Sequence, residues 1–123
     1  MPVLTLNRDL VSEVTCANDM LDVDVLDVSF LGEPDEPIRA VGDLSFLVNL
    51  RELFVRDHRI GTSAARLAAL ARLQVLDLGN NHVDDMTPLL ALGQLQRLLL
   101  DGNRISEVPG DISQKLNKLQ CLH

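Results

Sequence analysis

Aromatic residues are nearly absent from this chain of 123 residues. It has no Trp, no Tyr and three Phe, so it lacks the stacking platforms that hold single-stranded nucleic acid. The 18 acidic residues outnumber the 11 basic ones, and the formal net charge of -7 opposes contacts with phosphate groups. We therefore expect no direct binding of nucleic acid.

Cysteine is also scarce. Cys16 and Cys121 are the two cysteines, and their wide separation forms neither a CxxC pair nor a disulfide framework. A reduced, cytoplasmic setting is the expected one. No apolar run approaches the roughly 18 residues of a membrane span, and no basic segment followed by an apolar stretch opens the chain. We expect neither membrane association nor a secretory signal.

Motifs that carry enzyme chemistry are missing as well. The sequence has no HExxH, no GxSxG and no glycine-rich phosphate loop. The three histidines, His58, His82 and His123, do not stand at ligand spacing from a cysteine or a carboxylate. We expect no enzymatic activity, no metal site and no cofactor.

Leucine, in contrast, accounts for 25 residues and recurs in a fixed pattern. Residues 50–60, 73–83 and 95–105 all read LxxLxLxx(N/H)x(I/V), at a period of 22 to 23 residues. A weaker copy begins at Val23, and the start of a fifth copy lies at Leu119. Between the copies, apolar residues recur at every third position, which fits neither a regular helix nor a strand. Repetition at this period is typical of a solenoid of stacked coils.

The pattern resembles the leucine-rich repeat family, in its short 22-residue intracellular subclass, over roughly residues 20–123. The resemblance implies an α/β fold, a curved solenoid with a parallel sheet on its concave face and short 3₁₀ or helical turns on its convex face. It also implies a repeat domain at residues 21–123, with four complete copies and the start of a fifth. The C-terminal cap is missing, so the open edge either continues in a longer protein or pairs with a partner.

Residues 1–20 do not match the repeat. Leu6, Leu10, Val11 and Val14 stand at helical spacing, with Thr5 as a plausible N-cap. We expect an N-terminal capping helix that covers the first coil, with Cys16 buried against it.

Polar residues at the strand ends should satisfy the backbone where each coil turns. Asn81 and Asn103 occupy the position that is a buried Asn in the family, where His58 replaces it in the second copy and can fill only part of the role. The first copy has Leu31 there.

The turns carry signals of their own. We expect Gly79 and Gly102 to be turn glycines, and Thr87 to cap a short helix with Pro88 in its first turn. Asp84 and Asp85 would then serve the N-terminus of that helix.

Side chains between the core leucines should face the concave surface, because side chains alternate along a strand. Three columns follow from the sequence: Val25, Glu52, Val75 and Arg97; Asp27, Phe54, Asp77 and Leu99; Ser29, Arg56, Gly79 and Asp101. Apolar anchors surrounded by Arg and Asp are typical of protein interfaces, although single exposed apolar residues are also ordinary. The predicted partner-binding residues are Glu52, Phe54, Arg56, Asp77, Arg97, Leu99 and Asp101.

The function implied is a non-enzymatic scaffold for protein–protein interaction, with a partner protein on the concave face. The resemblance is greatest to ciliary and cytoskeletal repeat proteins, which would place the chain in the cytoplasm, in a cilium or axoneme, or on the cytoskeleton. The alternatives are a scaffold subunit of a ribonucleoprotein and a protein-phosphatase regulatory subunit. Residues 1–50 carry ten acidic residues and two basic ones, which either attract a basic partner or form a solvated acidic end.

Overall fold

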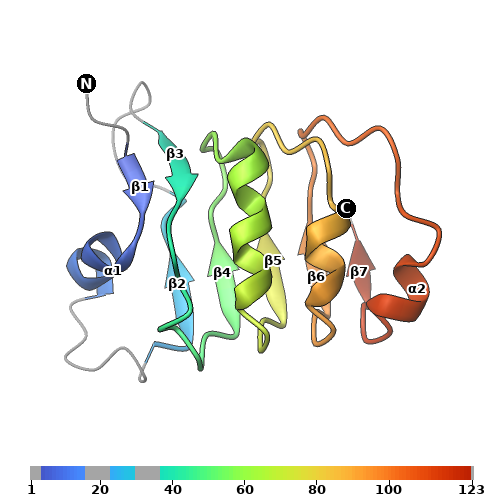
Figure 1. Ribbon diagram of the computed structural model, residues 1–123, viewed down its shortest axis with the longest axis horizontal. Helices are drawn as coiled ribbons and strands as arrows, with labels where there is room; N and C mark the ends of the chain where they lie inside the picture. The colour runs from blue at the N-terminus through green and yellow to red at the C-terminus, as the bar shows by residue number, and fades with distance from the viewer. Residues whose placement is uncertain (1–3, 16–22, 30–36, 123) are drawn as a thin grey trace.

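The computed structural model describes residues 4–15, 23–29 and 37–122. From β4 onward, strands alternate with short helices or helical turns along the chain (Figure 1). The elements, in chain order, are β1 (Leu4–Leu6), α1 (Arg8–Thr15), β2 (Val25–Asp27), β3 (Ile38–Val41), β4 (Glu52–Phe54), η2 (Gly61–Ala69), β5 (Val75–Asp77), η3 (Thr87–Ala91), β6 (Arg97–Leu99), α2 (Ile112–Lys115) and β7 (Cys121–Leu122).

Five of the strands form a parallel sheet in the order β2-β4-β5-β6-β7. Leu26, Leu53, Leu76, Leu98 and Leu122 pair in succession along it. The predicted repeat register is therefore confirmed, from the weak first copy to the start of the fifth. Each coil adds one strand to the sheet, beside the strand of the coil before it.

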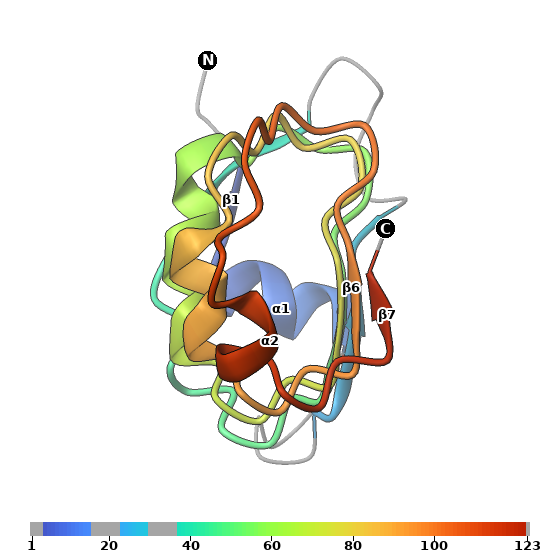
Figure 2. The same cartoon turned by 90° about the vertical axis from the view of Figure 1, so that its right-hand side faces the viewer.

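The core lies between this sheet and the helical turns η2 and η3, which run along the opposite side (Figure 2). Leu53, Leu76 and Leu98 are fully buried. The residues at every third position are buried too, which confirms the predicted spacing: Val41, Leu44, Leu47, Leu50, Leu67, Leu70, Leu73, Val83, Met86, Leu89, Leu92 and Leu95. Burying a side chain of this size contributes roughly 1.5–3 kcal/mol, so the stacked coils share one continuous core.

Polar side chains inside the coils satisfy the backbone where each strand ends. Asn103 donates from Nδ2 to the carbonyl oxygens of Leu78, at 2.8 Å, and Leu100, at 2.9 Å. Its Oδ1 accepts from the backbone N–H groups of Asn81 and Val83. Asn81 repeats the pattern one coil earlier, because its Nδ2 donates to Val55 and its Oδ1 accepts from the backbone at residue 60.

His58 takes the same place in the second copy. It is buried, its Nδ1 accepts from the backbone N–H of Ile38 at 2.9 Å, and its Nε2 lies 2.6 Å from the carbonyl oxygen of Val28. The Ile38 N–H can only donate, so Nε2 carries the ring proton and donates to Val28. A neutral imidazole has one N–H, whereas an amide has two. His58 therefore reproduces the contacts to the preceding coil but not the second donation that each Asn makes within its own coil. We call His58, Asn81 and Asn103 the inner ladder.

The N-terminal segment differs in part from the prediction. Leu4–Leu6 is not helical but forms β1, which pairs in parallel with β3 in a separate two-stranded sheet. Helix α1 begins at Arg8, and Asn7 rather than Thr5 caps it, because the Asn7 Oδ1 accepts from the backbone N–H of Leu10 at 3.0 Å. Leu10 and Val11 lie in the same core as the repeats.

The turn before η3 also corrects a prediction. Thr87 is the first helical residue and not the N-cap. The Asp85 carboxylate accepts from the Thr87 backbone N–H at 2.9 Å, as expected for an acidic residue at a helix start. Gly102 has a φ of 73°, in the left-handed region that favours glycine.

Two predictions lie outside the described residues, namely the burial of Cys16 and the place of Leu31 in the first copy. Among the helices that the structure describes, none is both long enough and apolar enough to cross a bilayer.

Candidate functional site

One face of the five-stranded sheet is open to solvent, and we call it the strand face. The strand register places Val25, Glu52, Val75 and Arg97 in one row across it, and Asp27, Phe54, Asp77 and Leu99 in a second row. Both rows follow the predicted columns. Each of the first four strands therefore contributes one apolar and one charged side chain, in alternating order.

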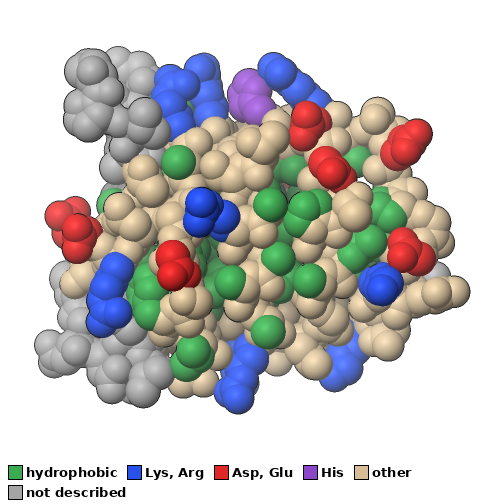
Figure 3. Space-filling model, in the orientation of Figure 1, with side chains coloured by type: hydrophobic (Ala, Val, Ile, Leu, Met, Phe, Trp, Pro, Cys, Tyr) green, Lys and Arg blue, Asp and Glu red, His purple; other side chains and the backbone are tan. Residues whose placement is uncertain are grey.

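The apolar members of these rows are large. Val25 is 47% exposed, and Phe54, Val75 and Leu99 are half-buried. They change rows from strand to strand, so together they form a zigzag across the sheet. On the opposite side (Figure 3), the exposed apolar residues of η2 and η3 are alanines, namely Ala65, Ala69 and Ala91. The strand face therefore carries larger apolar side chains than these two helical turns do, and two further exposed valines, Val48 at 52% and Val108 at 56%, lie outside the strands.

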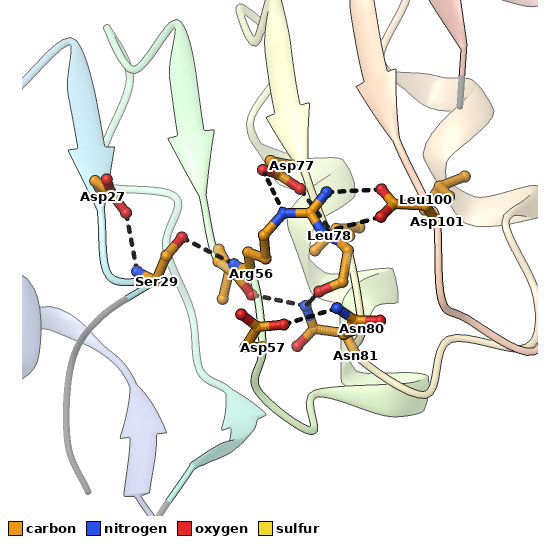
Figure 4. Close-up of polar contacts among 12 residues, drawn as sticks. Asp27, Ser29, Arg56, Asp57, Asp77, Leu78, Asn80, Asn81, Leu100 and Asp101 are labelled. Carbon is orange, nitrogen blue, oxygen red and sulfur yellow. Dashed lines mark hydrogen bonds and ion pairs between the residues drawn. The ribbon is translucent and has the colours of Figure 1, made fainter. Parts of the chain in front are cut away.

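The guanidinium group of Arg56 lies beside the zigzag and is paired with carboxylates of the same chain (Figure 4). Arg56 follows β4, and its Nε donates to the Asp77 carboxylate at 3.2 Å. Its two terminal nitrogens donate to both oxygens of Asp101, at 3.0 and 2.7 Å. We call these three residues the guanidinium strap. It joins the second coil to the fourth across the third, and the Arg56 pKa is raised above its ordinary value by the hydrogen bonds to Asp101.

Gly79 makes room for the strap. A Cβ atom at this position would lie 2.3 Å from Nη1 of Arg56 and 2.4 Å from its Cζ, much closer than such atoms can approach. Gly79 lies in a turn, as predicted, but its φ is not positive. The residue at this position is small because the guanidinium lies over it.

Asp77 also departs from the prediction of an exposed residue. It is 8% exposed, because Arg56 covers it. Its second oxygen accepts from the Gly79 backbone N–H at 3.0 Å. Asp27, at the same repeat position, binds the Ser29 N–H in the same way. Both acidic residues therefore support the end of their strand.

The strand end of the second coil is held differently. Phe54 stands where the neighbouring coils have Asp, so it cannot accept from the residue two positions later. The Arg56 backbone N–H donates instead to the Ser29 hydroxyl at 3.0 Å. Ser29 is thus a residue of the site whose contact the sequence pattern did not indicate.

The predicted site residues thus divide into two groups. Arg56, Asp77 and Asp101 contact one another. Glu52, Phe54, Arg97 and Leu99 are not drawn into that network, and they remain available on the strand face. The role of Gly79 was not predicted. The repeat pattern does not show that the Arg56 side chain passes over Gly79 to reach Asp101.

No group of three or more His, Cys, Asp or Glu side chains suited to a metal ion occurs in the described parts of the chain. A pocket outside the sheet is lined by Asp84, Asp85, Thr87, Ser106, Glu107 and Pro109. Within it, hydrogen bonds from the side chain and backbone of Thr87 lower the pKa of Asp85.

Comparisons with known proteins agree with this architecture. No family model matches the chain. Among curated proteins, osteomodulin of Rattus norvegicus is 38% identical over 79 residues, which are 62% of this chain and 18% of that protein. The chain therefore spans less than a fifth of this relative.

Solved structures with a similar fold include two internalins and a leucine-rich repeat protein. Internalin C2 of Listeria monocytogenes matches with a TM-score of 0.56 and 29% identity, over 70% of this chain and 44% of that one. A second internalin of the same organism matches with a TM-score of 0.58 and 26% identity, over 70% and 26% of the two chains. A leucine-rich repeat protein of Leptospira interrogans, at 20% identity and a TM-score of 0.57, shares the fold over 99% of this chain and 35% of its own. Together with the repeat register, these similarities support placing the chain among the leucine-rich repeat proteins.

Proposed function

We propose that the chain is a non-enzymatic scaffold for protein–protein interaction and that its partner binds on the strand face. The observation that supports this is the zigzag of Val25, Phe54, Val75 and Leu99, large apolar side chains that four successive strands leave partly exposed. An interface needs a few buried apolar anchors with a polar surround, and these rows supply both. The comparisons support a binding scaffold in general terms.

Helix α1 has a supporting part in this proposal. Leu10 and Val11 are buried in the shared core, so α1 would act as the predicted cap of the first coil. At the other end, β7 pairs with β6 on one side, and its second edge is where a partner strand or a further coil would add.

The setting of the scaffold is part of the proposal as well. A ciliary or cytoskeletal assembly in the cytoplasm is the first choice, because the repeat period and the N-terminal helix are similar to proteins of that kind. A ribonucleoprotein scaffold and a phosphatase regulatory subunit are the alternatives, and the identity of the captured partner decides between them.

Capture experiments test the proposed face. Phe54→Asp together with Leu99→Asp places two carboxylates among the anchors, and a partner bound there should be lost. Val48→Asp is the matched control, because Val48 is 52% exposed and lies outside the strand face. Crosslinking capture and mass spectrometry should identify a protein retained by the wild type and by Val48→Asp but not by the double variant. Identical capture by all three chains would refute the assignment.

Calorimetry with the captured partner gives the size of the effect. Phe54→Ala should weaken binding by about 2 kcal/mol, while the free energy of unfolding in urea changes little because the ring is half-buried. Equal partner affinity of wild type and variant would contradict the role of Phe54.

A further inference from the structure

The guanidinium strap determines which charges on the strand face a partner can use. Arg56 is bound to Asp77 and Asp101, so one positive charge meets two negative ones and the three residues together keep one negative charge. Three further charged residues in the rows are Asp27, Glu52 and Arg97. Within the part of the chain that the structure describes, none of the three forms an ion pair.

These three charges are unevenly placed. Asp27 lies on β2 and Glu52 on the adjacent β4, whereas Arg97 lies two strands further on, in β6. Asp24 and Arg51 directly precede β2 and β4, and the Arg51 backbone N–H donates to the Asp24 carbonyl at 2.8 Å. These two neighbours carry opposite charges. Among the charges that form no ion pair, the two rows are therefore acidic at β2 and β4 and basic at β6, and the strap adds one net negative charge near β5 and β6.

The zigzag lies between these two charged ends, and its spacing suits one kind of segment. Neighbouring strands are about 4.8 Å apart, so its four apolar residues span about 14 Å. An α-helix rises about 5.4 Å per turn, so a helix lying across the strands would place about one turn over each of them. An extended segment repeats its side chains on one face at nearly 7 Å, which does not match the strands.

A helix also suits the open face of a sheet for a second reason. The backbone groups of these strands are already paired within the sheet, so the face offers no hydrogen bonds to an extended backbone. A helix satisfies its own backbone and needs only side-chain contacts.

We propose that the strand face takes an amphipathic helix of a partner protein in one orientation, with its N-terminal turn over Asp27 and Glu52 and its C-terminal turn over Arg97. This inference rests on the proposed function and adds the partner's chemistry and direction. The helix dipole places partial positive charge at the N-terminus and partial negative charge at the C-terminus, so both ends then meet the opposite sign. The partner carries Lys or Arg in its first turn, Asp or Glu in its last turn, and aliphatic residues on the face between them.

Designed peptides provide the probe. Two hydrocarbon-stapled helices of identical composition would carry the same leucine face. The first has Lys in its first turn and Glu in its last, and the second has these charges exchanged. Stapling holds both peptides helical, because the exchanged peptide is otherwise the better helix former. Fluorescence anisotropy at low and high salt should give about tenfold tighter binding of the first peptide, a difference of about 1.4 kcal/mol, and the difference should shrink with salt.

Charge inversion in the protein completes the test. Glu52→Lys combined with Arg97→Glu leaves the net charge of the protein unchanged, but Asp27 keeps its negative charge, so the preference for the first peptide should disappear or reverse. The control Arg66→Glu with Glu107→Lys changes exposed charges off the strand face and should keep the original preference. Circular dichroism checks that each variant is folded.

The outcomes separate this inference from the proposed function. Equal binding of the two peptides, binding of neither, or a preference that inversion leaves unchanged would overturn the oriented helix. If capture of the natural partner still depends on Phe54 and Leu99 in that case, the scaffold function stands and only the direction and chemistry of its partner fall. If capture does not depend on them, the proposed function itself fails.

Discussion

Two polar networks join neighbouring coils of this molecule, and they differ in what surrounds them. The inner ladder of His58, Asn81 and Asn103 lies inside the coils, where Asn81 is fully buried and His58 is 3% exposed. The guanidinium strap lies on the strand face, where the Arg56 and Asp101 side chains are 31% and 50% exposed. In both networks, single side chains make two or more hydrogen bonds and reach an adjacent coil.

The difference in burial decides what each network contributes. A backbone group of the inner ladder that loses its partner stays dry, which costs roughly 1–3 kcal/mol. A group of the strap that loses its partner is hydrated instead, and exposed ion pairs contribute only about 0.2–1 kcal/mol. The inner ladder therefore contributes more to the free energy of folding, whereas the strap mainly decides which charges the strand face presents.

The largest expected effect comes from the centre of the inner ladder. Asn81→Leu removes the partners of the Val55 and Gly79 carbonyls and of the Ile60 N–H. We expect the free energy of unfolding in urea to fall by about 3 kcal/mol. Asn103→Leu is the comparison, and because Asn103 is half-buried, water can replace part of what it provides. An equal loss in the two variants would contradict the role assigned to burial.

A smaller effect is expected at His58. His58→Leu leaves the Val28 carbonyl and the Ile38 N–H without partners and should cost about 2 kcal/mol. His58→Asn introduces the amide that the other coils have, and its free energy of unfolding should lie within about 1 kcal/mol of the wild-type value. Urea unfolding of the three chains gives the order, and an Asn variant as unstable as the Leu variant would show that the ring itself is needed.

The strap can be examined with a double-mutant cycle. Gly79→Ala displaces the guanidinium and should lower stability by no more than about 1 kcal/mol, the value of an exposed ion pair. In an Arg56→Gln background the added methyl group has room, so the same substitution should be neutral or stabilise by about 0.4–1 kcal/mol through the unfolded chain. A cost of Gly79→Ala that is the same in both backgrounds would mean that Gly79 does not serve Arg56.

The smallest effect is expected outside both networks, at Asp85. The folded state lowers the pKa of this carboxyl below its ordinary value of 3.8 through Thr87. Its contribution is therefore complete above that value and is lost as the pH falls through the lowered pKa. Asp85→Asn should be slightly less stable than the wild type at about pH 6, and the gap should narrow at about pH 3. A gap that does not change with pH would remove the carboxylate from the account.

The candidate site was partly predictable, because its rows follow from the repeat. Phe54 and Leu99 lie half-buried on the strand face as their place between core leucines indicated. Asp77 was expected to be exposed and is buried, since Arg56 covers it. The columns place Arg56 near Asp77 and Asp101, but the repeat spacing does not show that the Arg56 side chain reaches over Gly79 and covers Asp77.

The amino-acid sequence by itself determined the period, the strand register, the core positions and the place of the inner ladder, because each of these recurs in several coils and so leaves a repeated signal. Only the tertiary structure decided the pairing of β1 with β3, the Asn7 cap, the burial of Asp77 and the steric role of Gly79. Those features occur once, in segments of a few residues or between distant coils. Their energies come from contacts that exist only after the coils have stacked.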